Sequence, residues 1–185
     1  MAQAAAAQPI FYYDLGDPNC YLIAEQVNTA LPIVPEWEPV IASPQRAQVD
    51  REHVERRAAE LQLQPLRWPR EWPPDTRQAM LVATYAKRVG RAVAFSLAAF
   101  RQAFAAGRDL GDTDTLLIAA AACEMHPTAV LKGIELRSVA QALAEAGTRA
   151  AEAGADRLPA IQVDGRLYQG DDVLSHAARA LQEIG

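Results

Sequence analysis

Residues 11–22 read FYYDLGDPNCYL, and this stretch decides the fold. Its aromatic beginning is typical of a buried strand. Asp17 is a residue type favoured at a helix N-cap, and Pro18 is one favoured in the first helical turn. We therefore expect a strand that leads directly into a helix with Cys20 in its first turn. The N-terminus of such a helix is a common place for thiol chemistry, because it lowers the pKa of a nearby cysteine.

Beyond this first helix, which is expected to end near Leu31, one strand precedes a long helical block. Acidic N-caps, glycines and prolines mark the expected helix ends. Four prolines in PLRWPREWPP (65–74) predict a loop after the first helix of the block. The expected elements are a disordered alanine-rich leader before Pro9, a strand over 36–43, and helices over 50–63, 75–90, 91–107, 112–125 and 127–147.

The end of the chain carries the strongest short-range hairpin signal, AIQV and RLY on either side of Asp164 and Gly165. A terminal helix is expected to begin near Asp171 or Asp172. Two strands at each end of a chain cannot form a complete sheet unless the ends meet. We therefore predict an α/β protein with a thioredoxin-like fold and a large all-helical insertion.

A single domain is expected over residues 1–185, because this length allows one sizeable core and 50% of the residues are hydrophobic. We expect the thioredoxin-like core over about 9–45 and 155–185, and the helical insertion over about 50–150.

Charge and hydropathy exclude several classes of partner. The formal net charge is −5 and the 18 Lys and Arg residues are spread along the chain, so nothing favours a nucleic acid or an anionic membrane surface. No apolar run approaches the roughly 20 residues needed to span a bilayer, and the first residues lack the basic and apolar regions of a signal peptide. A cytoplasmic location is therefore expected.

The two cysteines, Cys20 and Cys123, lie too far apart in the sequence to form a metal-ligand pair. We expect both thiols to be reduced. A disulfide between them remains an alternative if the helical block folds over the first helix.

No metal is expected, because the three histidines fall in separate expected elements: His53, His126 and His176. The chain lacks a glycine-rich phosphate loop, and no nucleotide is expected.

Four segments carry a family resemblance: FYYDLGDPNCYL, PLRWPREWPPDTRQAM, FRQAFAAGRDLGDTDTLL and LPAIQVDGRLYQGDDVL. In this order they resemble the DsbA-type thioredoxin-fold family, nearest to its branch of 2-hydroxychromene-2-carboxylate isomerases and kappa-class glutathione transferases. The resemblance covers nearly the whole chain after residue 9. It implies an oxidoreductase or a glutathione-dependent isomerase or transferase, with glutathione or another low-molecular-weight thiol as cofactor and a small molecule as substrate. The oligomeric state stays open, a homodimer being one alternative.

The resemblance implies that residues 17–20 form part of the site. The oxidoreductases have C-P-x-C there and the isomerase and transferase branch has S-P-x-[SA], whereas this chain has Asp17, Pro18, Asn19 and Cys20. As an N-cap, Asp17 stabilises the helix by about 1 kcal/mol, but a carboxylate about 4 Å from a thiolate repels it by up to about 4 kcal/mol. We therefore expect impaired thiolate activation at this helix N-terminus.

Cys20 stands at the second cysteine position of the family motif. It is either a redox-active or adduct-forming monothiol, or a small apolar core residue. Cys123 lies in an alanine-rich segment and is expected in the core.

Two further segments are similar to ligand-binding parts of the family. In RLPA, Pro159 matches a proline that follows a cis peptide bond, beside which the backbone of Leu158 would pair with a bound thiol or peptide. In YQGDDVL, Asp172 matches an acidic residue that meets the ligand's amino group, while Val173 replaces the family's arginine. Asp171 and Asp172 are also good helix caps, so both roles stay open.

Trp68 and Trp72 fall in the proline-rich loop, which borders the hydrophobic substrate region in the isomerase branch. They either line an aromatic substrate pocket or pack the loop against the core.

Three functional hypotheses follow. The first is an enzyme that acts on a thiol-bearing or aromatic small molecule, with Asp17 as general base or orienting group. The second is a non-catalytic protein that binds a peptide or small hydrophobic ligand beside Pro159. The third is a monothiol sensor at Cys20.

Overall fold

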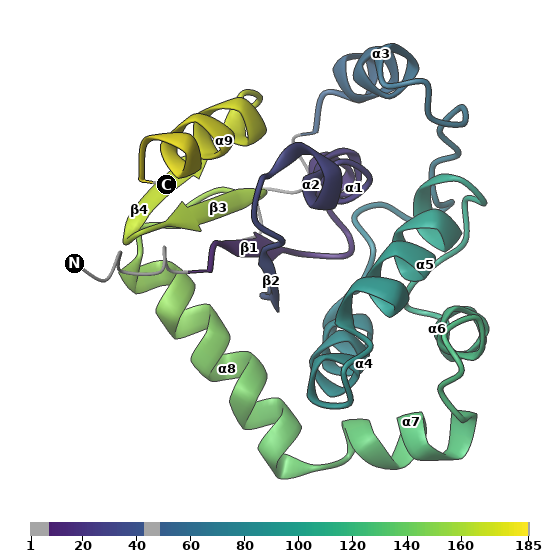
Figure 1. Cartoon of the computed structure of the whole chain (residues 1–185). Helices are drawn as coiled ribbons and strands as arrows, with labels where there is room; N and C mark the ends of the chain where they lie inside the picture. The colour runs from purple at the N-terminus through teal and green to yellow at the C-terminus, as the bar shows by residue number, and fades with distance from the viewer. Residues whose placement is uncertain (1–7, 43–48, 185) are drawn as a thin grey trace.

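The computed structural model describes residues 8–42 and 49–184, and it contains a mixed four-stranded sheet (Figure 1). The strands are β1 (Ile10–Tyr13), β2 (Glu36–Pro39), β3 (Ala160–Val163) and β4 (Arg166–Gln169). Their order is β2-β1-β3-β4, with β1 parallel to β2 and antiparallel to β3, and β4 antiparallel to β3. Strands from both ends of the chain lie side by side, which confirms the thioredoxin-like fold.

The insertion between β2 and β3 is helical, as expected, and its helices α4 to α7 stand beside the sheet (Figure 1). In the described part of the chain, no helix is both long enough and apolar enough to cross a membrane. The helices are α1 (Pro18–Ala24), α2 (Val27–Ala30), α3 (Arg51–Glu60), α4 (Arg77–Arg88), α5 (Ala92–Phe104), α6 (Thr113–Ala121), α7 (Pro127–Ile134), α8 (Arg137–Glu152) and α9 (Val173–Ile184).

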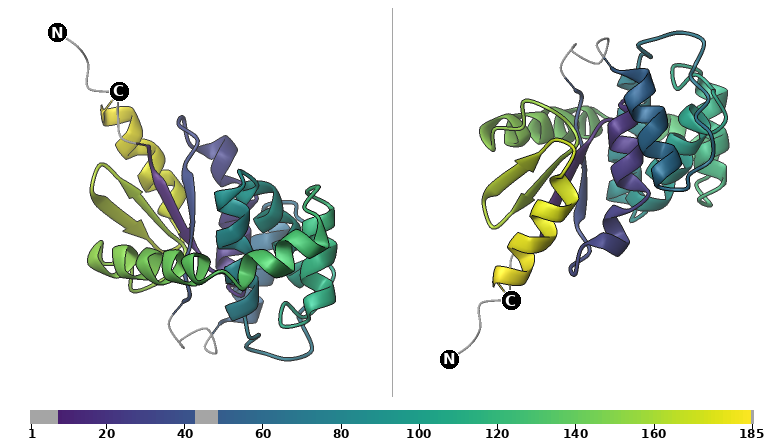
Figure 2. Two further views of the ribbon diagram at one scale, coloured as in Figure 1. Left: turned by 90° about the horizontal axis from the view of Figure 1, so that it is seen from below. Right: turned by 90° about the horizontal axis from the view of Figure 1, so that it is seen from above.

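The two faces of the sheet are covered by different helices. Because successive side chains of a strand point to opposite faces, Phe11 and Tyr13 belong to the larger core, which includes residues of α1, α5 and α9. Tyr12 points the other way and packs in a smaller cluster with Ala146 and Ala150 of α8. α9 therefore covers one face and α8 the other, as the two views of Figure 2 show.

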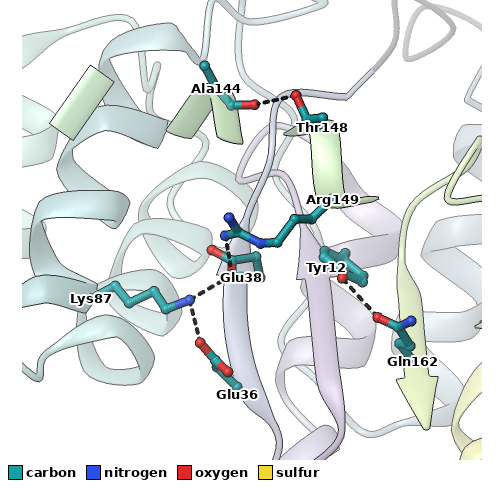
Figure 3. A network of polar contacts seen from close by, with 8 residues as sticks. All are labelled: Tyr12, Glu36, Glu38, Lys87, Ala144, Thr148, Arg149 and Gln162. Carbon is teal, nitrogen blue, oxygen red and sulfur yellow. Dashed lines mark hydrogen bonds and ion pairs between the residues drawn. The ribbon is translucent and has the colours of Figure 1, made fainter. Parts of the chain in front are cut away.

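A polar network joins the insertion to the edge strand β2 (Figure 3). Lys87 Nζ of α4 lies 2.6 Å from Glu36 Oε1 and 2.8 Å from Glu38 Oε2. Arg149 of α8 donates a hydrogen bond of 3.1 Å to the same Glu38 oxygen. Glu38 thus connects β2 to two helices of the insertion.

The prediction of one helix that continues to Leu31 is wrong in one respect, because the segment forms two helices, α1 and α2. In a continuous helix the Gln26 N–H would donate to the Leu22 carbonyl. Instead, the Gln26 side-chain amide donates to that carbonyl at 2.8 Å, and the Gln26 N–H donates to the Ile23 carbonyl at 3.0 Å. The side chain takes the place of the backbone donor, and the helix ends.

The helix expected over 127–147 is likewise two helices, α7 and α8. Leu136 between them is extended (φ −68°, ψ 122°) and is the N-cap residue of α8. The expected end at Gly147 is also wrong, since this glycine lies inside α8. The chain leaves the helix at Gly154, where a φ of 88° suits glycine because it has no Cβ atom.

The predicted hairpin is confirmed. Asp164 and Gly165 have φ values of 47° and 77°, as its tight turn requires. Pro39, which cannot donate a ladder hydrogen bond, is tolerated because β2 is an edge strand. Residues 1–7 of the expected leader and Ser43 at the end of the expected second strand lie outside the described residues.

Candidate functional site

The N-terminus of α1 is capped by Asp17, the residue that the sequence resemblance places at the attacking position. Asp17 Oδ1 accepts hydrogen bonds from the N–H groups of Asn19 at 2.8 Å and Cys20 at 3.3 Å. Asp17 is only 7% exposed. Because helix N-terminal N–H groups are the ones that stabilise an anion, this carboxylate competes with a bound thiolate for them. The predicted N-cap is confirmed.

Asp14 positions the loop before α1, a role that sequence reasoning missed. Its carboxylate is fully buried and accepts hydrogen bonds of 2.8 Å from the N–H groups of both Gly16 and Ala42. The Thr76 hydroxyl, at the start of α4, donates to it at 3.5 Å. Asp14 therefore fixes the loop against two segments that are distant in the sequence, and only the local contact to Gly16 could have been expected.

A cavity of about 180 Å³, here called the inner cavity, opens beside the first turn of α1. It lies between α1, α3, the loop before β3 and the turn before α9. The Leu158–Pro159 peptide bond in its wall is cis. The lining residues are Asn19, Leu22, Ile23, His53, Arg57, Arg157, Leu158, Pro159, Gly170 and Asp171. The cavity thus combines an apolar wall with several charged groups.

A wider hollow of about 1090 Å³, here called the outer groove, adjoins the inner cavity and includes Asp17. It is rich in carboxylates, since Asp50 and Asp156 also line it. The residues shared by the two hollows are Asn19, His53, Arg157, Leu158 and Asp171. A ligand of moderate size can therefore lie in both.

The shared wall contains a contact between the insertion and the core. His53 Nε2 of α3 lies 3.4 Å from Asp171 Oδ2 in the turn before α9. Of the two acidic residues expected at this turn, Asp171 lines both hollows and Asp172 lines neither. The Asp172 carbonyl accepts a hydrogen bond from the His176 N–H at 3.0 Å, so this residue opens α9.

The cysteines do not reach the two hollows. Cys20 is fully buried and, like the buried Pro18, lines neither of them. Cys123 is buried as expected, and its thiol donates to the Ala119 carbonyl at 3.3 Å. Burial raises the pKa of the Cys123 thiol, and the positive charge of Arg91 partly offsets this. Cys20 and Cys123 are not joined in a disulfide, so that alternative is not realised.

Trp68 packs in an aromatic group away from the two hollows. Its ring meets Trp72 edge-on with centroids 5.2 Å apart, and Phe104 at 6.2 Å. Its indole N–H donates to Glu55 Oε1 at 2.6 Å, and the Arg51 guanidinium lies 4.7 Å from the ring centroid. Neither tryptophan lines the inner cavity or the outer groove, which favours the packing role over the substrate role.

Three lining residues of the inner cavity were missed from the sequence: His53, Arg57 and Arg157. His53 and Arg57 are four residues apart on α3, so helical spacing places them on one face. That signal was present in the sequence, but the packing of α3 against α1 was not. In residues 8–42 and 49–184, no three His, Cys, Asp or Glu side chains are grouped to hold a metal ion.

Comparisons with known proteins agree with this fold. The family model of the DSBA-like thioredoxin domain matches residues 10–182. No curated protein matches the chain in sequence. The structure of a 2-hydroxychromene-2-carboxylate isomerase is similar over 95% of both chains, with a TM-score of 0.82 and 14% identity.

Two bacterial oxidoreductases have similar structures. A probable DsbA oxidoreductase from Streptomyces coelicolor matches 96% of this chain with 89% of its own, at a TM-score of 0.77 and 19% identity. The cytosolic disulfide reductase DsbM from Pseudomonas aeruginosa is similar over 96% of this chain and 94% of its own chain, with a TM-score of 0.66 and 14% sequence identity. At such low identities the likeness shows the fold alone.

Proposed function

Since this chain belongs to the DSBA-like thioredoxin domain family, we propose that it is an enzyme that binds a small thiol-bearing or aromatic molecule between the α1 N-terminus and Pro159. Glutathione or another low-molecular-weight thiol is the proposed cofactor. The observation that carries this proposal is the inner cavity, where the first turn of α1, Pro159 and several charged side chains converge.

The protein's own thiols favour isomerase- or transferase-type chemistry over disulfide exchange. Exchange requires an accessible attacking thiolate, whereas Cys20 is fully buried and Cys123 is 7% exposed. By the family resemblance the attacking position is held by Asp17, whose carboxylate caps α1. The reacting sulfur therefore comes from the bound thiol, and Asp17 acts as an orienting group or as the general base.

The lining of the inner cavity fits a thiol such as glutathione. Its ammonium group would find a carboxylate at Asp171, and its methylene groups would contact Leu22 and Pro159. When bound, the thiol supplies a nucleophilic sulfur. The protein supplies the lining of the inner cavity, and the Asp17 carboxylate in the adjoining outer groove supplies a proton or hydrogen-bond acceptor.

Calorimetric titration of the purified protein with glutathione and with cysteine tests this function. We expect saturable binding that is weakened in Asp17→Ala, because the variant loses the proposed orienting acceptor, and this loss outweighs the freeing of the N–H groups of Asn19 and Cys20. Asp112→Ala is the matched control, because Asp112 caps α6 through the Asp114 N–H at 3.1 Å and lies outside both hollows. No saturable binding, or equal binding by all three proteins, would contradict the proposal.

A non-catalytic ligand- or peptide-binding protein is the second candidate. It is favoured by the Asp17 cap, which already uses the N–H groups of Asn19 and Cys20. Assays of insulin reduction and of 2-hydroxychromene-2-carboxylate isomerisation separate the two candidates. Isomerase turnover that Cys20→Ala leaves intact supports the enzyme, whereas ligand binding without turnover in either assay supports the second candidate.

The monothiol-sensor hypothesis has its own test at Cys20. Because this thiol is fully buried, we expect mass spectrometry to find no adduct on native protein treated with hydrogen peroxide and glutathione. Denatured protein is the positive control and should be modified at Cys20. An adduct on the native protein would restore the sensor hypothesis.

A further inference from the structure

The loop between α8 and β3 forms one wall of the inner cavity through Arg157, Leu158 and Pro159, here called the loop wall. The start of this loop is held by local hydrogen bonds. The Gly154 N–H donates to a carbonyl of α8, and the Asp156 N–H donates to the Gly154 carbonyl. These bonds join the start of the loop to α8, but they do not reach the loop wall.

A side chain from another element reaches the loop wall. Gln169, the last residue of β4, is half-buried, and its Oε1 accepts a hydrogen bond of 2.9 Å from the Arg157 N–H. Its Nε2 donates at 3.3 Å to the Gly154 carbonyl. Because a backbone N–H only donates and a carbonyl only accepts, the two partners determine which way the amide is turned. One side chain thus bridges the start of the loop and the loop wall.

The backbone of Gln169 leads into another wall of the same cavity. Gly170 and Asp171, here called the turn wall, follow Gln169 directly in the chain and line the cavity before α9. Gln169 also pairs with Ala160 between β3 and β4, and Ala160 is the residue after Pro159. Gln169 therefore holds the loop wall through its side chain and carries the turn wall on its main chain.

We propose that Gln169 is a positioning residue, which sets the separation between the loop wall and the turn wall. The inference rests on the proposed function for its consequence, because the separation of the walls then determines how tightly the thiol ligand is bound. Gln169 itself lines neither hollow. An amide supplies both an acceptor and a donor, as the Arg157 N–H and the Gly154 carbonyl require.

Three variants separate the two hydrogen bonds of this amide. Gln169→Met has a similar length and loses both bonds, whereas Gln169→Glu in its ionised form keeps the acceptor for the Arg157 N–H and loses the donor to the Gly154 carbonyl. Gln141→Met is the matched control. Gln141 of α8 also donates one hydrogen bond through its amide, at 2.9 Å to Glu145 Oε1, and it lies outside both hollows.

The first measurement needs no ligand. Amide hydrogen exchange, followed residue by residue by NMR, reports whether the Arg157 N–H keeps its acceptor. We expect this exchange to be about threefold to tenfold faster in Gln169→Met, a factor that one hydrogen bond supplies. Gln169→Glu and Gln141→Met should exchange at the wild-type rate at this amide.

The second measurement is the dissociation constant of glutathione by calorimetry. Gln169→Met should weaken binding by about threefold to tenfold, and Gln141→Met should leave it unchanged. Gln169→Glu should recover most of the affinity, because the bond to the loop wall remains. A loss of stability alone would not produce this recovery, and urea denaturation verifies that all four proteins are folded under the conditions of the titration.

The outcomes separate this inference from the proposed function. If exchange at Arg157 is as slow in Gln169→Met as in Gln141→Met, the inference is overturned, whether or not glutathione binds. If exchange is faster but the affinity for glutathione is unchanged, the positioning role is overturned while the proposed function stands. If exchange is faster in Gln169→Met alone and none of the proteins binds glutathione, Gln169 positions the loop wall as inferred and the proposed function fails.

Discussion

Two carboxylates of equal exposure, Glu38 and Asp17, are held in different ways. Each is 7% exposed. Glu38 Oε2 lies 2.8 Å from Lys87 Nζ and 3.1 Å from the Arg149 guanidinium, so it connects β2 to α4 and α8 (Figure 3). Asp17 Oδ1 accepts hydrogen bonds from N–H groups in the first turn of its own helix.

This difference separates a structural carboxylate from a candidate functional one. Glu38 lines neither hollow, and its cationic partners come from helices far away in the sequence. Asp17 lines the outer groove, and its cap is local. We therefore expect loss of Glu38 to lower the stability of the whole fold, and loss of Asp17 to affect ligand binding more than stability.

The largest expected effect is that of Glu38→Ala. Breaking a buried ion pair by removing one partner costs about 3–5 kcal/mol. The Lys87 and Arg149 side chains are 26% and 52% exposed and can be partly solvated, so a smaller loss is expected. We predict a decrease of about 2–3 kcal/mol in the free energy of unfolding, measured by urea denaturation followed by circular dichroism.

The control for this variant is Glu124→Ala. Glu124 pairs with Arg91 at 3.2 Å, but the two side chains are 83% and 48% exposed. Surface pairs of this kind contribute about 0–1 kcal/mol. If Glu38→Ala destabilises the protein no more than Glu124→Ala does, Glu38 does not hold the insertion to the sheet and the comparison with Asp17 breaks down.

The second prediction concerns the stability of Asp17→Ala beside Asp112→Ala. Each variant removes one N-cap, and each should lower the free energy of unfolding by about 1 kcal/mol. Equal losses of stability, together with a loss of ligand affinity in Asp17→Ala alone, would sharpen the contrast with Glu38. A loss in Asp17→Ala as large as that in Glu38→Ala would show that Asp17 is a structural carboxylate as well.

The local structure was predictable where it depends only on neighbours in the sequence. The cap at Asp17 and the tight turn at Asp164 follow from local residue preferences. The break at Gln26 was not predictable, because its side chain competes with its own backbone for one carbonyl while the apolar pattern continues. The break at Leu136 was not predictable either, because the apolar residues keep a helical spacing through this position.

The candidate site was predictable only on the core side. Asn19, Leu158 and Pro159 were expected from the family motifs and do line the inner cavity. Arg57 was missed because periodicity reveals which face of α3 it occupies, but not which element that face meets. The network of Glu38 was missed for the same physical reason, because its partners come from helices placed by long-range packing.

The smallest expected effect is the pH dependence that Tyr12 contributes beside Glu38. Burial raises the pKa of Tyr12 above its ordinary value of 10.0, the negative charge of Glu38 raises it further, and the positive charge of Arg149 lowers it. The folded state therefore disfavours the charged phenolate. This contribution to stability is fully present below pH 10.0 and is lost as the pH rises through the folded-state pKa.

Tyr12→Phe isolates this contribution. At pH 8 the variant should lose about 0.5–1.5 kcal/mol, because the hydrogen bond of 3.0 Å from the Tyr12 hydroxyl to Gln162 is removed. Above pH 10 the stability of the wild type should fall more steeply than that of the variant, since other tyrosines with raised pKa values are common to both proteins. Urea denaturation at pH 8 and at several alkaline values measures the difference.

Repeating the pH series in a Glu38→Gln background shows whether Tyr12 reports the charge of Glu38. Without that negative charge the pKa of Tyr12 should move down toward its ordinary value, because the second-largest cause of the rise is gone. The difference between the tyrosine and phenylalanine proteins should then shrink. If it is unchanged, the Glu38 charge does not act on Tyr12, and Lys87 and Arg149 neutralise it completely.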